Sequence, residues 1–403
     1  MKKKKVLLAL TSSFLTLLVL LFVGEVYERY RQGPGDTIQP GPFDVEFLSG
    51  RGDKISDQTG PLHLVINPYT VYSSAPSQRT AEFAIDSHGF RTEEGLENDR
   101  RPKIVILGGS SAFGLGVKDP DTISSYLERE IPTHRLINAG VVGYLSGQEL
   151  GLFVNTASDY RPQLVIAYDG WNDLYDPIYG PVVRYPNEVG VSASFLTFQE
   201  RLVKSNDSKT QLGPSLVEFF RIASSKSYLL KWATRKFGFE KRPRLISECE
   251  ASEVGSASRR ERNEKLLEAA VDAYVRNLTK LSNASHAYGA EFIVVIQPEL
   301  GGKVVRTESE TVALKARFWN CYRDEFPELY KRFVAAAKLR LTQVGIPFID
   351  LNEAAVFRES NETLFFDVVH TTELGNQKAV SIILPQIKSL LAKHQGNEAT
   401  SLK

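Results

Sequence analysis

Short, wholly apolar runs alternate along this chain with stretches that have helical spacing. The runs at 103–107, 135–138 and 164–168 predict strands, and a glycine-rich segment follows each one. Helical spacing follows the first two of these loops, at 122–130 and 146–158. Strands and helices that alternate in this way predict a three-layer α/β/α fold with a mostly parallel sheet. In such folds, ligands bind beyond the carboxyl ends of the strands, where all three glycine-rich segments would lie.

The alternation stops near residue 176 and resumes near 259. Residues 176–258 contain prolines and isolated aromatic residues without a strand pattern, so we interpret them as an insertion and a possible lid. Within it, 216–237 predicts a cationic amphipathic helix, which either packs on the domain or rests on a membrane surface. After it, the pattern predicts helices at 259–288, 328–343 and 373–394, and strands at 291–296 and 347–351.

The N-terminus has the pattern of a membrane anchor. A cluster of lysines at 2–5 precedes an apolar run at 6–23, which as a helix would span about 27 Å, close to the thickness of the hydrocarbon core. The lysines predict a cytoplasmic N-terminus, and the end of the run lacks the small residues of a signal-peptide cleavage site. We therefore expect a single transmembrane helix, with the domain outside the bacterial inner membrane and facing the periplasm.

These patterns divide the chain into six segments. They are a lysine cluster and anchor (1–24), a tether with an N-terminal extension (25–101), the first part of the α/β domain (102–175), the insertion (176–258), the second part of the domain (259–395) and a tail (396–403). The extension contains short β-like runs at 62–66 and 80–85.

Composition narrows the function only slightly. The chain has 403 residues, of which 42% are apolar, and a net charge of +1, so neither wholesale disorder nor a general attraction to nucleic acid is expected. The two cysteines, Cys249 and Cys321, fit neither a zinc site nor a CxxC motif, and whether they form a disulfide stays open. The histidines are scattered, so we expect no metal site and no cofactor.

The loops carry residues suited to nucleophilic catalysis. Ser110 follows Gly108-Gly109 at the end of the first strand of the α/β domain, where it is either a nucleophile or a helix N-cap, and Ser111 is the alternative nucleophile. His370 stands three residues after Asp367, close enough for the carboxylate to orient the imidazole as a base.

Acyl transfer also needs hydrogen-bond donors for the developing oxyanion. Gly143 can offer a backbone N–H, and Asn172 can offer a side-chain amide at the end of the third strand of the α/β domain. Gly and Asn are equally common as plain turn residues. Tyr144, Tyr168 and Trp171 lie near the same loops and would either stack on a sugar or pack in the core.

Taken together, these segments resemble the four blocks of the SGNH (GDSL-like) hydrolase family. Gly109-Ser110 corresponds to the Ser block and Asn138 to Gly143 to the Gly block. Gly170-Trp171-Asn172-Asp173 matches the GxND block, and Asp367-Val368-Val369-His370 matches the DxxH block. The resemblance implies a Ser110–His370–Asp367 triad, and an oxyanion hole made by the N–H groups of Ser110 and Gly143 and by the Asn172 side chain.

The chain departs from the family pattern in the first block. Gly109 stands where the family usually has Asp, and Ser111 stands where it has Leu. Such a GGS form resembles a membrane-anchored branch of the family. The departure affects the expected substrate preference more than the expected mechanism.

The function expected from this resemblance is a serine esterase that cleaves an O-acyl group, such as acetyl, from a cell-envelope glycan or lipid. The alternatives are an O-acyltransferase acting on an exported polysaccharide and a non-catalytic, membrane-tethered binding module. A short-chain dehydrogenase is disfavoured, because Ala112 replaces the second motif glycine and no acidic residue ends the second strand of the α/β domain, which closes in Asn138. The expected partners are the acylated substrate and the membrane, and not nucleic acid.

Overall fold

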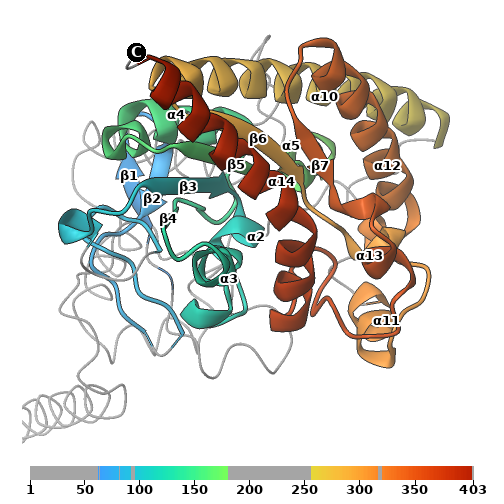
Figure 1. The fold of residues 1–403 in the computed structure, drawn as a ribbon. Helices are drawn as coiled ribbons and strands as arrows, with labels where there is room; N and C mark the ends of the chain where they lie inside the picture. Colours follow the sequence, from blue (N-terminus) through green and yellow to red (C-terminus); the bar gives the residue numbers. More distant parts are fainter. Residues whose placement is uncertain are drawn as a thin grey trace, which may run out of the picture. The chain divides into compact units, whose positions relative to one another are not determined.

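A five-stranded parallel sheet forms the centre of the fold, with the strands in the order β4-β3-β5-β6-β7 (Figure 1). The strands are β3 (Lys103–Gly108), β4 (Arg135–Asn138), β5 (Leu164–Asp169), β6 (Glu291–Ile296) and β7 (Phe348–Asp350). The computed structural model describes residues 62, 64–80, 82–91, 96–179, 256–315 and 320–401, all within one unit of the chain. Within them, the predicted α/β fold with a parallel sheet is confirmed.

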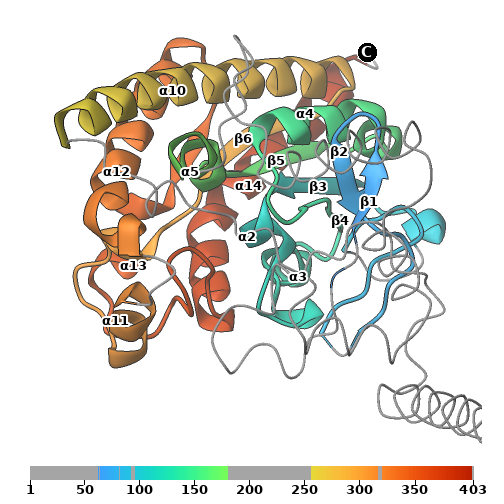
Figure 2. The same cartoon turned by 180° about the vertical axis from the view of Figure 1, so that it is seen from behind.

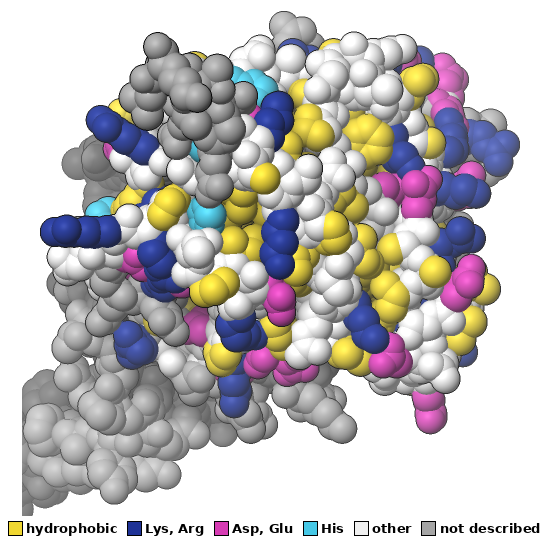
Figure 3. Space-filling model, viewed as in Figure 1, with side chains coloured by type: hydrophobic (Ala, Val, Ile, Leu, Met, Phe, Trp, Pro, Cys, Tyr) yellow, Lys and Arg dark blue, Asp and Glu magenta, His cyan; other side chains and the backbone are white. Residues whose placement is uncertain are grey.

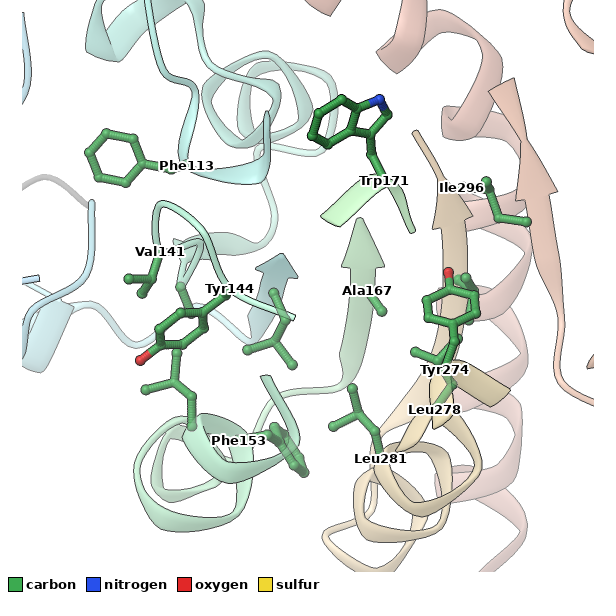
Figure 4. Packing of buried hydrophobic residues seen from close by; sticks show 14 of the residues in the cluster. Phe113, Val141, Tyr144, Phe153, Ala167, Trp171, Tyr274, Leu278, Leu281 and Ile296 are labelled. Carbon is green, nitrogen blue, oxygen red and sulfur yellow. The ribbon is translucent and has the colours of Figure 1, made fainter. Parts of the chain in front are cut away.

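Both faces of the sheet are covered, which explains why the middle positions of its strands are apolar, whereas polar residues such as Lys103, Arg135 and Asp169 lie at strand ends. Along β3, Val105 and Leu107 pack into one hydrophobic cluster, whereas Ile104 and Ile106 pack into the other on the opposite face. Side chains alternate between the two faces of a strand, so in a sheet covered on both faces the middle positions of a strand are apolar on either side. Figure 4 shows the first cluster, in which Ala167 of β5 and Ile296 of β6 meet side chains from the covering helices.

Helices cover the two faces as separate layers (Figures 1 and 2). One layer contains α4 (Ser146–Asn155), α5 (Trp171–Tyr179), α10 (Ser256–Ala287) and α12 (Asn320–Gln343). The other contains α3 (Ile123–Glu130) and α14 (Glu373–Ser401). Three shorter helices, α2 (Ser110–Phe113), α11 (Glu308–Lys315) and α13 (Ala355–Glu359), lie in the connections between these elements.

The main departures from the predicted elements lie in the connections. The extension contains an antiparallel hairpin of β1 (Leu64–Asn67) and β2 (Val71–Ser74), whereas the run predicted at 80–85 forms only an isolated bridge. The Thr80 hydroxyl accepts the N–H groups of Glu82 and Phe83, and this local hydrogen bonding competes with strand pairing. Helix α5 was not predicted, and neither were α11 and α13.

Several predictions lie outside the described residues, namely the anchor at 6–23, residues 180–255 of the insertion, and Cys249. Among the residues that are described, no helix combines the length and the apolar character needed to cross a membrane.

On the face shown in Figure 3, basic and acidic side chains are interspersed, so the described residues there form no broad patch of one charge.

Arg91 ties the N-terminal extension to the loop that follows α2. Arg91 is 5% exposed, and its guanidinium donates to the carbonyl oxygens of Phe113, Gly114 and Val117 at 2.6–3.0 Å. It also donates to Asp119 at 2.8 Å. One planar group with five N–H donors therefore satisfies carbonyls in a loop that has no regular secondary structure to satisfy them.

Arg91→Met should lower the free energy of unfolding by about 3 kcal/mol or more, because it leaves buried carbonyls and Asp119 without their donor. Urea unfolding followed by circular dichroism measures this loss. Arg100→Met is the matched control, since Arg100 is exposed, and its free energy of unfolding should change by less than about 0.5 kcal/mol. Equal stability of the two variants would contradict this role for Arg91.

Candidate active site

The carboxyl end of β3 places Ser110 in a sharp turn. Gly108 ends the strand with φ 150°, and a Cβ added there would lie 2.2 Å from the carbonyl oxygen of Tyr168. Gly109 is the N-cap of α2 and Ser110 is its first residue, so Ser110 does not fill the N-cap position that was the alternative interpretation. The turn leaves the Ser110 side chain partly exposed at the edge of the sheet.

Asp367 and His370 lie in the turn of a short hairpin between β7 and α14. Phe365 and Thr371 pair across this hairpin, and Phe366 N–H donates to the carbonyl of His370 at 3.1 Å. Asp367 Oδ1 accepts the backbone N–H groups of Val369 at 2.9 Å and His370 at 2.7 Å. These bonds fix the carboxylate within the turn, so that its second oxygen points at the imidazole.

The structure brings Ser110, His370 and Asp367 into one chain of hydrogen bonds. His370 Nδ1 lies 2.6 Å from Asp367 Oδ2, and His370 Nε2 lies 2.7 Å from Ser110 Oγ. A carboxylate can only accept, so Nδ1 carries the proton and Nε2 accepts from the serine hydroxyl. His370 is 2% exposed, and the ring of Phe366 stacks against its imidazole. This tautomer is the one in which a histidine can take a proton from serine.

The residues predicted to bind an oxyanion lie on the neighbouring strand ends. Asn172 Nδ2 donates to the carbonyl of Tyr144 at 2.9 Å, which orients the amide and leaves its second N–H for another acceptor. A Cβ at Gly109 would lie 2.5 Å from this nitrogen, so a side chain at this position would displace the amide from where it lies. Among the hydrogen bonds of the described residues, none uses the N–H of Ser110 or Gly143.

The loop that carries Gly143 is supported from two sides. Ser146 donates through Oγ to Asp173 Oδ1 at 2.6 Å, and its backbone N–H donates to the same carboxyl group. On the other side, Tyr72 of β2 donates through its hydroxyl to the carbonyl of Val142 at 3.1 Å. Asp173 is therefore placed to fix this loop relative to Asn172, its neighbour in sequence, and the N-terminal extension completes the support.

The aromatic residues considered for sugar stacking are core residues instead. Tyr144 and Tyr168 are each 1% exposed and Trp171 is 3% exposed, so none presents a face to a ligand in this structure. Figure 4 shows Tyr144 and Trp171 among the packed side chains of the first cluster. Their spacing on strand ends and on α5 reflects packing against the helices.

A group of buried carboxyls behind the site was not recognised in the sequence as functional. Glu149, Asp169 and Asp173 are at most 7% exposed, and Tyr274 Oη donates to Asp169 at 2.5 Å. Burial raises the pKa of Asp173 to about 8 and that of Asp169 to about 6, and burial with nearby acidic groups raises the pKa of Glu149 well above its usual range. Glu149 and Asp169 are both buried, and the negative charge of Asp169 is one of the causes that raise the pKa of Glu149.

Ser111, the alternative nucleophile, points away from the histidine and is buried. Its Oγ accepts from Gln297 Nε2 at 3.2 Å. Gln297 follows β6 on the same edge of the sheet. Within the described residues, no group of three or more His, Cys, Asp or Glu side chains is arranged to hold a metal ion.

Comparison with known proteins yields structural similarities at low sequence identity. No protein-family model matches the chain, and no curated protein matches its sequence. A lipase/acylhydrolase from Enterococcus faecalis is 14% identical, with a TM-score of 0.38, and the match covers 72% of this chain and 96% of that one. An esterase, EstA, from Pseudoalteromonas sp. is also 14% identical, with a TM-score of 0.36 and coverage of 72% and 98%. Similarity at this level does not establish a function, which therefore depends on the geometry of the site.

Gly109→Ala should reduce the rate at which Ser110 reacts with a fluorophosphonate by about 10²–10³-fold, as expected for loss of one oxyanion donor. The added methyl group would displace the Asn172 amide, while the backbone at 109, with φ −84°, tolerates alanine. The rate is measured by labelling at a series of times. In an Asn172→Ala background the same change should cost little, because the two variants remove the same donor. Full additivity of the two losses would contradict this explanation.

The buried carboxyls should make the folded state less stable as the pH rises. Their pKa values are raised by burial, so between about pH 5 and pH 8 the folded state holds more protons than the unfolded chain. The free energy of unfolding should then fall across this range, by up to about 1.4 kcal/mol per pH unit for each proton concerned.

Urea unfolding at a series of pH values measures this slope. Asp173→Asn keeps an acceptor for Ser146 but removes the titrating group, so the slope should become shallower. An unchanged slope in this variant, or a wild-type stability that rises from about pH 5 to pH 8, would show that the carboxyls are ionised in the folded state.

Proposed function

We propose that this protein is a serine esterase of the SGNH type that cleaves an O-acyl group from a glycan or lipid. The observation that carries the proposal is the continuous set of hydrogen bonds from Ser110 Oγ to His370 and from His370 to Asp367, at 2.7 Å and 2.6 Å. A serine hydroxyl becomes a useful nucleophile only when a base within hydrogen-bonding distance removes its proton. In this arrangement His370 Nε2 can take the proton of Ser110, and Asp367 holds the imidazole in the orientation that this transfer requires.

The reaction then follows from the roles of these groups. Ser110 Oγ attacks the carbonyl carbon of the ester while its proton passes to His370 Nε2. Asp367 stabilises the imidazolium that forms. The negative oxygen of the tetrahedral intermediate accepts hydrogen bonds from the N–H groups of Ser110 and Gly143 and from Asn172 Nδ2. As the intermediate collapses, His370 gives its proton to the leaving alcohol and an acyl-serine remains.

Water completes the cycle in a hydrolase. His370 removes a proton from the water molecule, and the hydroxide attacks the carbonyl carbon of the acyl-serine. The bond from this carbon to Ser110 Oγ then breaks, the carboxylic acid leaves, and Ser110 recovers its proton from the imidazolium. An acyltransferase would use the same residues with a sugar hydroxyl in place of water. We propose hydrolysis because it needs only water and the groups described here. Acyl transfer would also need a site that binds the acceptor sugar.

The proposed substrate and location follow from the sequence. The apolar run at 6–23 and the preceding lysines support a catalytic domain outside the inner membrane, anchored by one helix. Acylated polymers or lipids of the cell envelope are the esters within reach of such a domain. Acetyl is the acyl group we propose.

Fluorophosphonate labelling of the full chain in detergent micelles, followed by peptide mapping, tests the nucleophile. The label should attach to Ser110. Ser110→Ala should abolish it, and His370→Ala should slow the reaction strongly, since loss of either residue in a serine hydrolase reduces the rate by a factor on the order of 10⁶. Ser111→Ala is the matched control and should be labelled normally.

The rate of hydrolysis of an acetyl ester such as 4-nitrophenyl acetate should rank the variants as the labelling rate does. The wild type and Ser111→Ala should be active, and Ser110→Ala and His370→Ala should lose most of the rate. Adding a xylo-oligosaccharide acceptor distinguishes the two reactions, because a transferase would form acetylated sugar at the expense of acetate. Labelling that persists in Ser110→Ala but disappears in Ser111→Ala would move the nucleophile by one residue. A folded wild-type protein that neither labels nor hydrolyses would favour the non-catalytic binding module.

A further inference from the structure

A fully buried ion pair lies beside the hairpin that carries Asp367 and His370. Lys303 Nζ lies 2.7 Å from both carboxylate oxygens of Glu310, and both side chains are 0% exposed. Lys303 follows β6 and Glu310 lies in the first turn of α11. Removing two charges from water is costly, and replacing such a pair by apolar residues is often neutral or stabilising. A gain in stability alone therefore does not account for the pair.

Besides accepting the N–H of Thr307 at 3.0 Å at the start of α11, the pair makes its hydrogen bonds to one arm of the hairpin. Glu310 Oε1 accepts the backbone N–H groups of Leu364 at 2.9 Å and Phe365 at 3.3 Å. Lys303 Nζ donates to the carbonyl of Glu362 at 2.6 Å. The pair thus satisfies backbone groups at three positions just before Asp367.

The arm held in this way determines where the turn lies. Thr372 N–H donates to the carbonyl of Leu364 at 2.8 Å, which closes the base of the hairpin. At the turn itself, Leu300 N–H donates to the carbonyl of Val368 at 2.9 Å. The segment 300–310 therefore fixes the hairpin at its base and at its turn, and these contacts place His370 Nε2 at 2.7 Å from Ser110 Oγ.

We propose that Lys303 and Glu310 are positioning residues, which hold the Asp367–His370 hairpin in register with Ser110. The essential part is the acceptor that Glu310 offers to Leu364 and Phe365, and Lys303 neutralises the buried carboxylate while binding Glu362. The proposal builds on the esterase function proposed above. A shift of about 1 Å in a catalytic group can reduce the rate about 10²-fold, so a small movement of this hairpin has a measurable effect.

Two double variants separate the acceptor from the charge. Both Lys303→Met with Glu310→Leu and Lys303→Met with Glu310→Gln remove the ion pair, but only the second keeps an oxygen that can accept from Leu364 and Phe365. Fluorophosphonate labelling of Ser110 should be about ten- to hundredfold slower in the Leu variant and close to wild type in the Gln variant. With 4-nitrophenyl acetate, the loss should appear in kcat rather than in KM.

Leu281→Ala controls for a general loss of stability. Leu281 lies in the core on α10 and is 0% exposed (Figure 4). Its truncation should lower the melting temperature but not the labelling rate of the folded protein. Equal labelling rates in the wild type and the Leu variant would overturn the proposal, and so would equal slowing of the Leu variant and Leu281→Ala at matched stability.

The downfield proton NMR signal of His370 Nδ1–H gives a readout that does not require activity. It is assigned by its absence in His370→Gln. The signal should be present in the wild type and in the Gln variant, and weakened or shifted in the Leu variant. If the wild type proves unreactive, the esterase function fails by itself. An unchanged signal in the Leu variant would then overturn the positioning role, and a lost signal would support it.

Discussion

The hydrogen bond between Ser110 Oγ and His370 Nε2 joins residues 260 positions apart in the chain, and the chemistry of the site depends on it. A bond of 2.7 Å tolerates only a few tenths of an ångström of error at either end. Ser110 is fixed by the end of β3, but His370 lies in a hairpin outside the sheet. The architecture must therefore position a connecting segment as accurately as it positions a strand, and connecting segments have no ladder of backbone hydrogen bonds to do so.

Part of this arrangement could be predicted from the sequence, because a parallel sheet brings the carboxyl ends of its strands to one edge. Ser110, Gly143 and Asn172 each follow an apolar run, so their convergence follows from the strand pattern. The strand order places β3 beside β5, which sets Ser110 and Asn172 on adjacent strands. Asp367 and His370 could be paired because they are close in sequence.

Other features depend on contacts between distant segments, which local patterns do not encode. Glu310 accepts a hydrogen bond from the backbone of Leu364, 54 positions away in the sequence, and Tyr274 donates one to Asp169, 105 positions away. No local pattern near Glu310 and Tyr274, which lie on helices, or near Asp169, which ends β5, indicates these distant partners. The sequence left the role of Tyr144 and Trp171 open, because an aromatic residue after a strand end has the same appearance whether it faces a ligand or the core. Whether the side chain is buried decides between these roles, and its burial depends on how the helices pack over the sheet.

Each loop of the site is held by a side chain with an ionisable group from a neighbouring element. Arg91 binds the carbonyls of the loop after α2, Asp173 binds the N–H and hydroxyl of Ser146 beside the Gly143 loop, and Glu310 binds the N–H groups of the His370 hairpin. A buried loop leaves backbone groups unsatisfied, and a charged partner forms a stronger hydrogen bond to them than a neutral one does. For Arg91 and Glu310, the cost of burying a charge is thus offset by hydrogen bonds that fix loops at the carboxyl edge of the sheet. This explains why the buried charges of the domain include groups that touch no reacting atom.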